Sequence, residues 1–185
     1  MMASNRLHIF TITIILLFVS GCSNHKIRHE LRAFQRSEVS LSFELERVLD
    51  RNIGIESPGS GAVSMVMYYD STECSQCRIS HLAECLPLYE MADSIRTFRI
   101  VTIFAPRQEE YDEVMASLMK QDFPYPIYVD FDGSFRKANP CIPEDKRFHS
   151  FLLDRDGHPV FVGNPVSSEK MHELFKRALE EACQE

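Results

Sequence analysis

The sequence predicts an α/β fold in which helices flank a central mixed β-sheet, with an N-terminal extension ahead of it. Three observations indicate this class. Continuous apolar runs, typical of buried strands, alternate with segments whose apolar residues recur every three or four positions, as on one face of a helix. An Asp156-Gly157 turn between two later apolar runs predicts a β-hairpin. An amphipathic helix is expected after it, so the order is β-α-β-α-β, hairpin, helix, in a partly parallel sheet.

Residues 1–21 are expected to be an export signal and not part of the fold. Arg6 precedes the apolar stretch 9–19, which is too short for a comfortable membrane span. The stretch ends in Val19-Ser20-Gly21-Cys22, which resembles the lipobox of bacterial lipoproteins. The resemblance implies that Cys22 is lipidated and becomes the new N-terminus, on the periplasmic side of a bacterial membrane, where disulfides persist. A plain secretory signal with an incidental cysteine is the alternative.

Residues 22–60 are expected to form a tether and an N-terminal extension. Apolar residues at 27, 31 and 34 predict a brief helix. Alternation over 39–45 predicts a short strand that runs into a helical turn at 45–49. Ser57-Pro58-Gly59-Ser60-Gly61 is a breaker, and it marks the start of the domain at 61–185.

The domain begins with an apolar run at 65–69, which predicts a buried strand. A helix is expected from about Ser75, and Pro87 should kink or restart it. The run 98–104 predicts a second strand, and residues 109–120 an amphipathic helix.

The second half of the domain continues with a third strand at 125–130 and at most one helical turn at 135–139. The hairpin strands are expected at 148–153 and 159–163. Ser167 or Ser168 can cap the last helix.

The chemically informative motif is Cys74-Ser75-Gln76-Cys77, between the first strand with its polar turn and the first helix. A sulfur at a helix N-terminus lies near unpaired N–H groups, which favour the thiolate. The second sulfur lies one turn on, where it can attack a mixed disulfide made by the first. A lone Cys-x-x-Cys also occurs as half of a zinc site.

This strand, turn, Cys-x-x-Cys and helix resemble the active-site segment of the thioredoxin-like superfamily, in particular its membrane-attached TlpA-like thiol-disulfide oxidoreductases. Phe151-Leu152-Leu153-Asp154 with Asp156-Gly157 resembles the family's F-L-I-D-x-D-G hairpin. The likeness covers about residues 60–183. It implies that Cys74 attacks, that Cys77 resolves, that protein thiols and disulfides are the partners, and that electrons for reduction come from a membrane donor. It requires no metal or organic cofactor.

Two positions depart from the family pattern. Glu73 stands where many members carry Trp, and its carboxylate would raise the pKa of Cys74. Arg147-Phe148-His149 stands where the family places a cis-proline facing the cysteines. An imidazolium at His149 would stabilise a nearby thiolate, whereas the alternative is a ring packed at a strand edge.

Two other functions are open. One is a redox-inactive thioredoxin-like binding module. The other is a copper or zinc site resembling that of Sco-type copper chaperones, formed by Cys74, Cys77 and His81. Cys85 is excluded from it because the helix rise places it roughly 12 Å from Cys77.

Composition and the remaining cysteines add limits. The net charge of −7 and the lack of a basic stripe argue against nucleic acid as a partner.

Cys85, Cys141 and Cys183 are left over after the motif and Cys22. Cys141 and Cys183 could form a bridge, or each could pack as a small hydrophobe.

Overall fold

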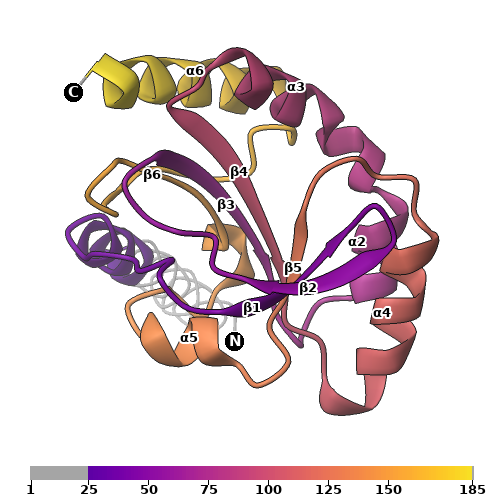
Figure 1. Ribbon diagram of the computed structural model, residues 1–185. Helices are drawn as coiled ribbons and strands as arrows, with labels where there is room; N and C mark the ends of the chain where they lie inside the picture. Colours follow the sequence, from indigo (N-terminus) through magenta and orange to yellow (C-terminus); the bar gives the residue numbers. More distant parts are fainter. Residues whose placement is uncertain (1–24, 185) are drawn as a thin grey trace, which may run out of the picture.

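A computed structural model describes residues 25–184 (Figure 1). Their strands form one seven-stranded sheet in the order β2-β1-β5-β4-β3-β6-β7. β3, β4 and β5 run parallel, and β6 is antiparallel to β3. The predicted central mixed sheet is therefore confirmed. The strands span β1 Leu45–Leu49, β2 Asn52–Glu56, β3 Val63–Tyr69, β4 Phe98–Phe104, β5 Ile127–Val129, β6 Ser150–Leu153 and β7 Pro159–Val162.

Helices cover both faces of this sheet (Figure 1). One face packs against α2, α3, α4 and α6, and the other against α5, a helix at 25–34 and the segment 38–42. The helices span α2 Ser75–Ser80, α3 Leu86–Ser94, α4 Tyr111–Lys120, α5 Ser134–Ala138 and α6 Glu169–Gln184, with short 3-10 turns at Leu82–Cys85, Gln108–Glu110 and Lys146–Phe148. None of the helices in the described residues is long and apolar enough to span a membrane.

β3 is the central strand, and all seven of its residues are buried. Its side chains alternate between the two cores: Met65 and Met67 pack with the α3 and α6 side, and Val66 and Tyr68 with the α5 side. Val66 pairs with Val101 on β4 and with Phe151 on β6. A strand covered on both faces carries a continuous apolar run, which is why this segment was readable from sequence.

Most elements of the domain lie where the sequence predicts them. The strand at 98–104 and the C-terminal hairpin are confirmed. The first helix restarts as expected: α2 ends at Ser80, and α3 begins at Leu86 with Pro87 in its first turn, where proline is tolerated. The hydroxyl oxygen of Ser168 accepts a hydrogen bond from the N–H of Met171, so Ser168 caps α6.

In the N-terminal extension, the brief helix predicted from residues 27, 31 and 34 is confirmed by a helix at 25–34, but the prediction for 39–49 was wrong. Neither a strand at 39–45 nor a helical turn at 45–49 forms. The hairpin of β1 and β2 occupies 45–56, and β1 pairs antiparallel with β5. The alternation over 39–45 reflects burial of Val39 and Leu41 against the α5 side of the core, without strand pairing. Asp50 and Arg51 both have positive φ, and this turn lacks the glycine that would have signalled a hairpin.

Candidate functional site

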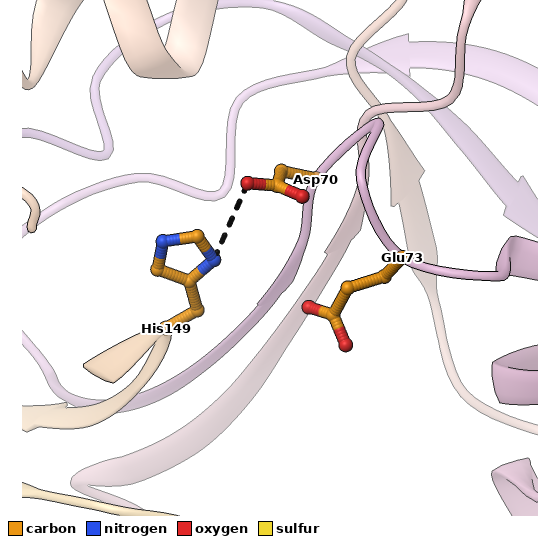
Figure 2. A group of neighbouring side chains, drawn as sticks. All are labelled: Asp70, Glu73 and His149. Carbon is orange, nitrogen blue, oxygen red and sulfur yellow. Dashed lines mark ion pairs between the residues drawn. The ribbon is translucent and has the colours of Figure 1, made fainter. Parts of the chain in front are cut away.

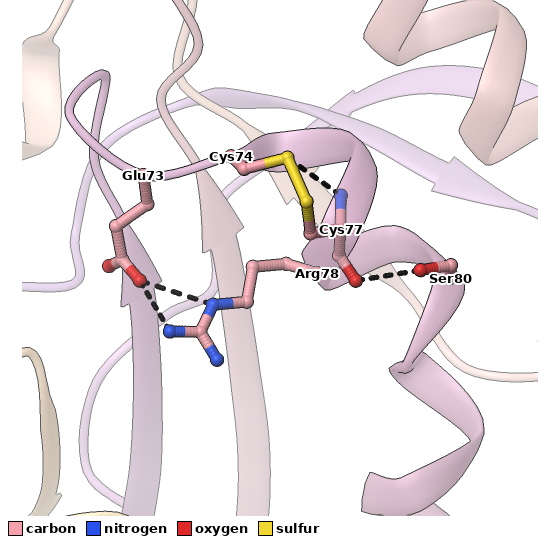
Figure 3. Close-up of a disulfide and its surroundings, with 5 residues drawn as sticks. All are labelled: Glu73, Cys74, Cys77, Arg78 and Ser80. Carbon is pink, nitrogen blue, oxygen red and sulfur yellow. Dashed lines mark hydrogen bonds and ion pairs between the residues drawn. A yellow bond between two sulfur atoms is a disulfide. The ribbon is translucent and has the colours of Figure 1, made fainter.

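The cysteine motif lies at the carboxyl end of β3, the central strand. Cys74 is the N-cap of α2, and its sulfur accepts a hydrogen bond from the N–H of Cys77 at 3.2 Å (Figure 3). The two cysteines are joined in a disulfide, with their Cα atoms 5.3 Å apart. Both residues are exposed. The placement at a helix start matches the sequence expectation, and the structure adds that both residues are accessible to another molecule.

The turn that links β3 to α2 is built on Asp70. Its Oδ1 accepts hydrogen bonds from the N–H of Thr72 at 2.8 Å and from the Thr72 hydroxyl at 2.6 Å. Its carbonyl accepts from the N–H of Glu73 at 3.0 Å. Such an Asp turn fixes the direction in which the chain leaves the strand. It leaves Oδ2 of Asp70 free to face another residue.

Glu73 is buried, and its charge is paired. Nε and Nη2 of Arg78 donate to the same carboxylate oxygen, Oε2, at 3.1 and 2.7 Å (Figure 3). The Arg78 guanidinium also lies over the ring of Tyr69, 5.2 Å from its centroid. Sequence reasoning considered Glu73 as an isolated negative charge beside Cys74. Arg78, which it missed, opposes that effect. The five-residue spacing is no standard helical pairing, because Glu73 precedes the helix.

His149 lies behind this turn and is 2 % exposed. Its Nε2 is 2.9 Å from the carbonyl oxygen of Pro143, and its Nδ1 is 3.7 Å from Oδ2 of Asp70 (Figure 2). The structure brings it together with Asp70 and Glu73, and no hydrogen bond or ion pair links it to either cysteine within residues 25–184. Burial beside the ring of Tyr68, 5.2 Å away, fits the packing alternative. No cis peptide bond occurs in these residues.

The other sequence-based candidates lie apart from the disulfide. His81 is exposed, and its Nδ1 is 2.7 Å from Glu84, so the structure does not gather the Cys74, Cys77 and His81 set. Cys85 is buried against the sulfur of Met67, and burial and Glu84 raise its pKa. Cys141 and Cys183 are both free, so the bridge between them does not form. Cys22 lies outside the described residues.

A hollow of about 310 Å³ opens beside Cys74. Its walls come from two elements: the motif itself and the start of α4. Arg107 donates a hydrogen bond to the carbonyl of Ser71 at 3.2 Å, which ties the two walls together. On the far wall, Glu110 is paired with Arg107 at 3.9 Å, and Glu113 forms no ion pair among the described residues. The lining residues are Thr72, Glu73, Cys74, Ser75, Gln76, Arg107, Glu110, Glu113 and Val114.

Comparison with known proteins supports the fold. No protein-family model matches the chain, and no curated protein does. Among solved structures, it is similar to a protein assigned as the thiol:disulfide interchange protein DsbE of Chlorobium tepidum, with 16 % identity, a TM-score of 0.51 and coverage of 80 % of this chain and 98 % of that one. It is also similar to a protein assigned as a protein disulfide isomerase of Bacteroides thetaiotaomicron, with 17 % identity, a TM-score of 0.50, and coverage of 80 % and 91 %. The chain therefore has a thioredoxin-like fold.

Proposed function

We propose that the protein exchanges disulfides with other proteins through Cys74 and Cys77. The observation that carries this proposal is an exposed disulfide at the start of the helix that follows the central strand. The N–H of Cys77 points at the sulfur of Cys74, where it would stabilise a thiolate. We assign Cys74 the attacking role and Cys77 the resolving role.

In the reducing direction, the Cys74 thiolate attacks one sulfur of a partner disulfide. A Cys74–partner bond forms, the partner's S–S bond breaks, and the released thiolate takes up a proton. The Cys77 thiol then loses its proton and attacks the sulfur of Cys74. The Cys74–Cys77 disulfide forms, and the second partner sulfur leaves as a thiolate that is protonated. Two electrons pass to the partner, and the same steps in reverse oxidise a partner dithiol.

The hollow beside Cys74 supplies the surface on which a partner segment would lie. Its wall at the start of α4 carries Glu113, which forms no ion pair among the described residues, beside the Arg107–Glu110 pair. A partner segment with a basic residue next to its cysteine fits this charge, because complementary potentials speed encounter and fix orientation.

We further propose that the protein works outside the cytoplasm, anchored by lipid on Cys22. Support comes from the apolar stretch 9–19 and from Ser20-Gly21-Cys22. Mass spectrometry of the mature N-terminus tests this: a diacylglyceryl-modified Cys22 is expected, and release of the Cys22→Ser variant from membranes should accompany it. An unmodified N-terminus elsewhere in the leader would contradict the proposal.

Trapping tests the exchange proposal. The Cys77→Ser variant should accumulate a mixed disulfide with partners through Cys74, whereas Cys74→Ser should not. Cys183→Ser is the matched control, because it removes a thiol far from the motif in sequence, and it should exchange as the unmodified chain does. Titration of the pair against glutathione should give a two-electron couple between roughly −120 and −270 mV.

The two alternatives give different results. A redox-inactive binding module predicts that the Cys74→Ser, Cys77→Ser double variant still captures its partner without covalent linkage. A thiol-based metal site predicts stoichiometric copper or zinc that is lost from the same variant. If the pair stays closed below about −300 mV, exchange is excluded.

A further inference from the structure

We propose that Asp70, Glu73 and His149 form a binding site for a divalent transition-metal cation of the zinc type. The three residues each offer one ligand atom, and these atoms all lie within 4.8 Å of one another (Figure 2). The site contains neither cysteine of the motif, so it is distinct from the thiol-based site considered above. It is also independent of disulfide exchange.

The orientation of His149 fits that of a metal ligand. The carbonyl oxygen of Pro143, 2.9 Å from Nε2, can only accept a hydrogen bond, so Nε2 carries the hydrogen. In the neutral ring, Nδ1 then presents a lone pair. This atom is buried and has no hydrogen-bond partner. A backbone carbonyl that orients one ring nitrogen while the other faces a metal is the usual arrangement around histidine ligands.

The groups that face Nδ1 are also acceptors. Oδ2 of Asp70 is 3.7 Å away, beyond hydrogen-bond distance for an imidazolium donor. Glu73 approaches from the other end of the turn, with its side chain only 5 % exposed. Glu73 and His149 are buried, and Asp70 is partly exposed. A cation between the three would offset the repulsion of the two carboxylates and give the buried imidazole nitrogen a partner. Arg78 supplies a positive charge to Oε2 of Glu73 and forms no ion pair with Asp70 or hydrogen bond with His149 among the described residues.

The donor set selects the class of metal. An imidazole nitrogen suits zinc, copper, iron and nickel, and carboxylates extend the set to manganese. Magnesium prefers six oxygen ligands and keeps most of its water. In a tetrahedral zinc site with bonds of about 2.0–2.2 Å, neighbouring ligand atoms lie about 3.4 Å apart. The 3.7 Å between Nδ1 and Oδ2 is already close to this separation.

The surroundings leave room for a fourth ligand. A hollow of about 220 Å³ is lined by Glu73 and His149, so water can complete a site with three protein ligands. Arg78, Lys146 and Arg147 also line this hollow. Two of these charges are paired, Arg78 with Glu73 and Arg147 with Asp145. The net positive rim lowers the affinity for a cation and favours an anionic fourth ligand, such as hydroxide.

Zinc titration of the full chain, kept in a non-ionic detergent with the Cys74–Cys77 disulfide closed and accessible thiols alkylated, tests the site. One Zn²⁺ per chain is expected, with no competition from a hundredfold excess of Mg²⁺. Asp70→Asn is the sharpest variant, because it keeps the Oδ1 acceptor of the turn and replaces only the oxygen that faces His149. It and His149→Gln should each weaken binding at least about tenfold.

His158→Gln is the matched control. Its Nδ1 lies 3.6 Å from Asp154, a similar pair but partly exposed and without a third ligand, so this variant should bind zinc as the unmodified chain does. Cobalt substitution gives a second readout that needs no variant: the spectrum should lack the thiolate-to-cobalt charge-transfer band. Absence of stoichiometric zinc, full binding by Asp70→Asn, or a thiolate band would each overturn the proposal.

Discussion

Arg78 reaches back from α2 to Glu73, the residue that precedes Cys74, and holds one oxygen of its carboxylate with two nitrogens at 2.7 and 3.1 Å. The pair places a positive and a negative charge at the same end of the helix as the disulfide. The Glu73 carboxylate is buried, whereas the Arg78 guanidinium is partly exposed. Solvent therefore screens the positive charge of Arg78 more than the negative charge of Glu73. The balance between the two charges sets the local field at the sulfur of Cys74.

Removal of Arg78 should make the disulfide harder to reduce. In Arg78→Ala, the Glu73 carboxylate acts on the Cys74 thiolate without its counter-charge, which destabilises the reduced state. A partly exposed pair contributes up to about 1 kcal/mol, so the reduction potential should fall by about 10–20 mV. Titration against glutathione measures the reduction potential, with EDTA present so that metal binding at Glu73 does not contribute.

The second substitution Glu73→Gln, in the same chain, should restore most of this loss, because it removes the uncompensated charge. Arg96→Ala is the matched control, since it makes the same change in net charge at an exposed position before β4. An equal fall in the reduction potential of Arg96→Ala would assign the effect to net charge and not to the Arg78–Glu73 pair.

Cys85 should be the least reactive of the three free cysteines within residues 25–184. It is buried against Met67, and burial together with Glu84 raises the pKa of its thiol, so little thiolate forms near neutral pH. In the folded protein at about pH 8, iodoacetamide should modify Cys141 and Cys183 well before Cys85. Peptide mass spectrometry follows each site. Unfolding in guanidinium should make the three rates similar, and early labelling of Cys85 in the folded chain would contradict its burial.

Asp130 should make stability fall as pH rises. Its carboxylate accepts hydrogen bonds from the N–H groups of Ser134 at 2.8 Å and Phe135 at 3.0 Å, yet burial raises its pKa above the ordinary 3.8. The folded chain therefore binds the proton more tightly than the unfolded chain. The contribution of Asp130 to stability is therefore greatest below pH 3.8 and is lost as the pH rises through its raised pKa. Urea denaturation measures this: the free energy of unfolding of Asp130→Asn should be lower than that of the unmodified chain, and the difference should shrink as the pH rises.

Asp132→Asn is the opposite case. Hydrogen bonds from Ser134 lower the pKa of Asp132, so its stabilisation is present above 3.8 and is lost as the pH falls through the lowered value. The free energy of unfolding of this variant should therefore fall further below that of the unmodified chain as the pH rises. If the free energies of unfolding of the two variants changed with pH in the same direction, the opposite pKa shifts assigned to Asp130 and Asp132 would be contradicted.

The β1–β2 turn should be open to stabilisation. Arg51 has φ of 61°, a left-handed conformation that is unfavourable for residues other than glycine. Arg51→Gly should raise the free energy of unfolding by about 0.5–1 kcal/mol, as measured by urea denaturation. Asn52→Gly, at the neighbouring residue whose φ is not positive, is the control and should destabilise the chain. A loss of stability in Arg51→Gly would mean that its side chain contributes more than the turn strain costs.

The sequence by itself determined the elements whose signals are local. β3 carries a continuous apolar run over 65–69 and β4 is mostly apolar, as expected of strands covered on both faces. Pro87 marks a helix start through its ring and Ser168 through its side-chain hydroxyl. The position of Cys74 and Cys77 at a helix start follows from the same local order. The hairpin at 45–56 was missed because its turn lacks glycine and its strand β2 lies at the sheet edge, with little burial to create a pattern.

Only the tertiary structure decided what surrounds the cysteines. The order of the strands places β6 beside β3, and this brings His149 to Asp70 and Glu73, more than seventy positions away in sequence. Arg78, the partner of the buried Glu73, lies only five residues along the chain, whereas the contact of His149 with this turn depends on the long-range packing of β6 against β3. The sequence therefore supplied the sulfur chemistry, and the packing of β6 against β3 supplied the cluster of charges behind it.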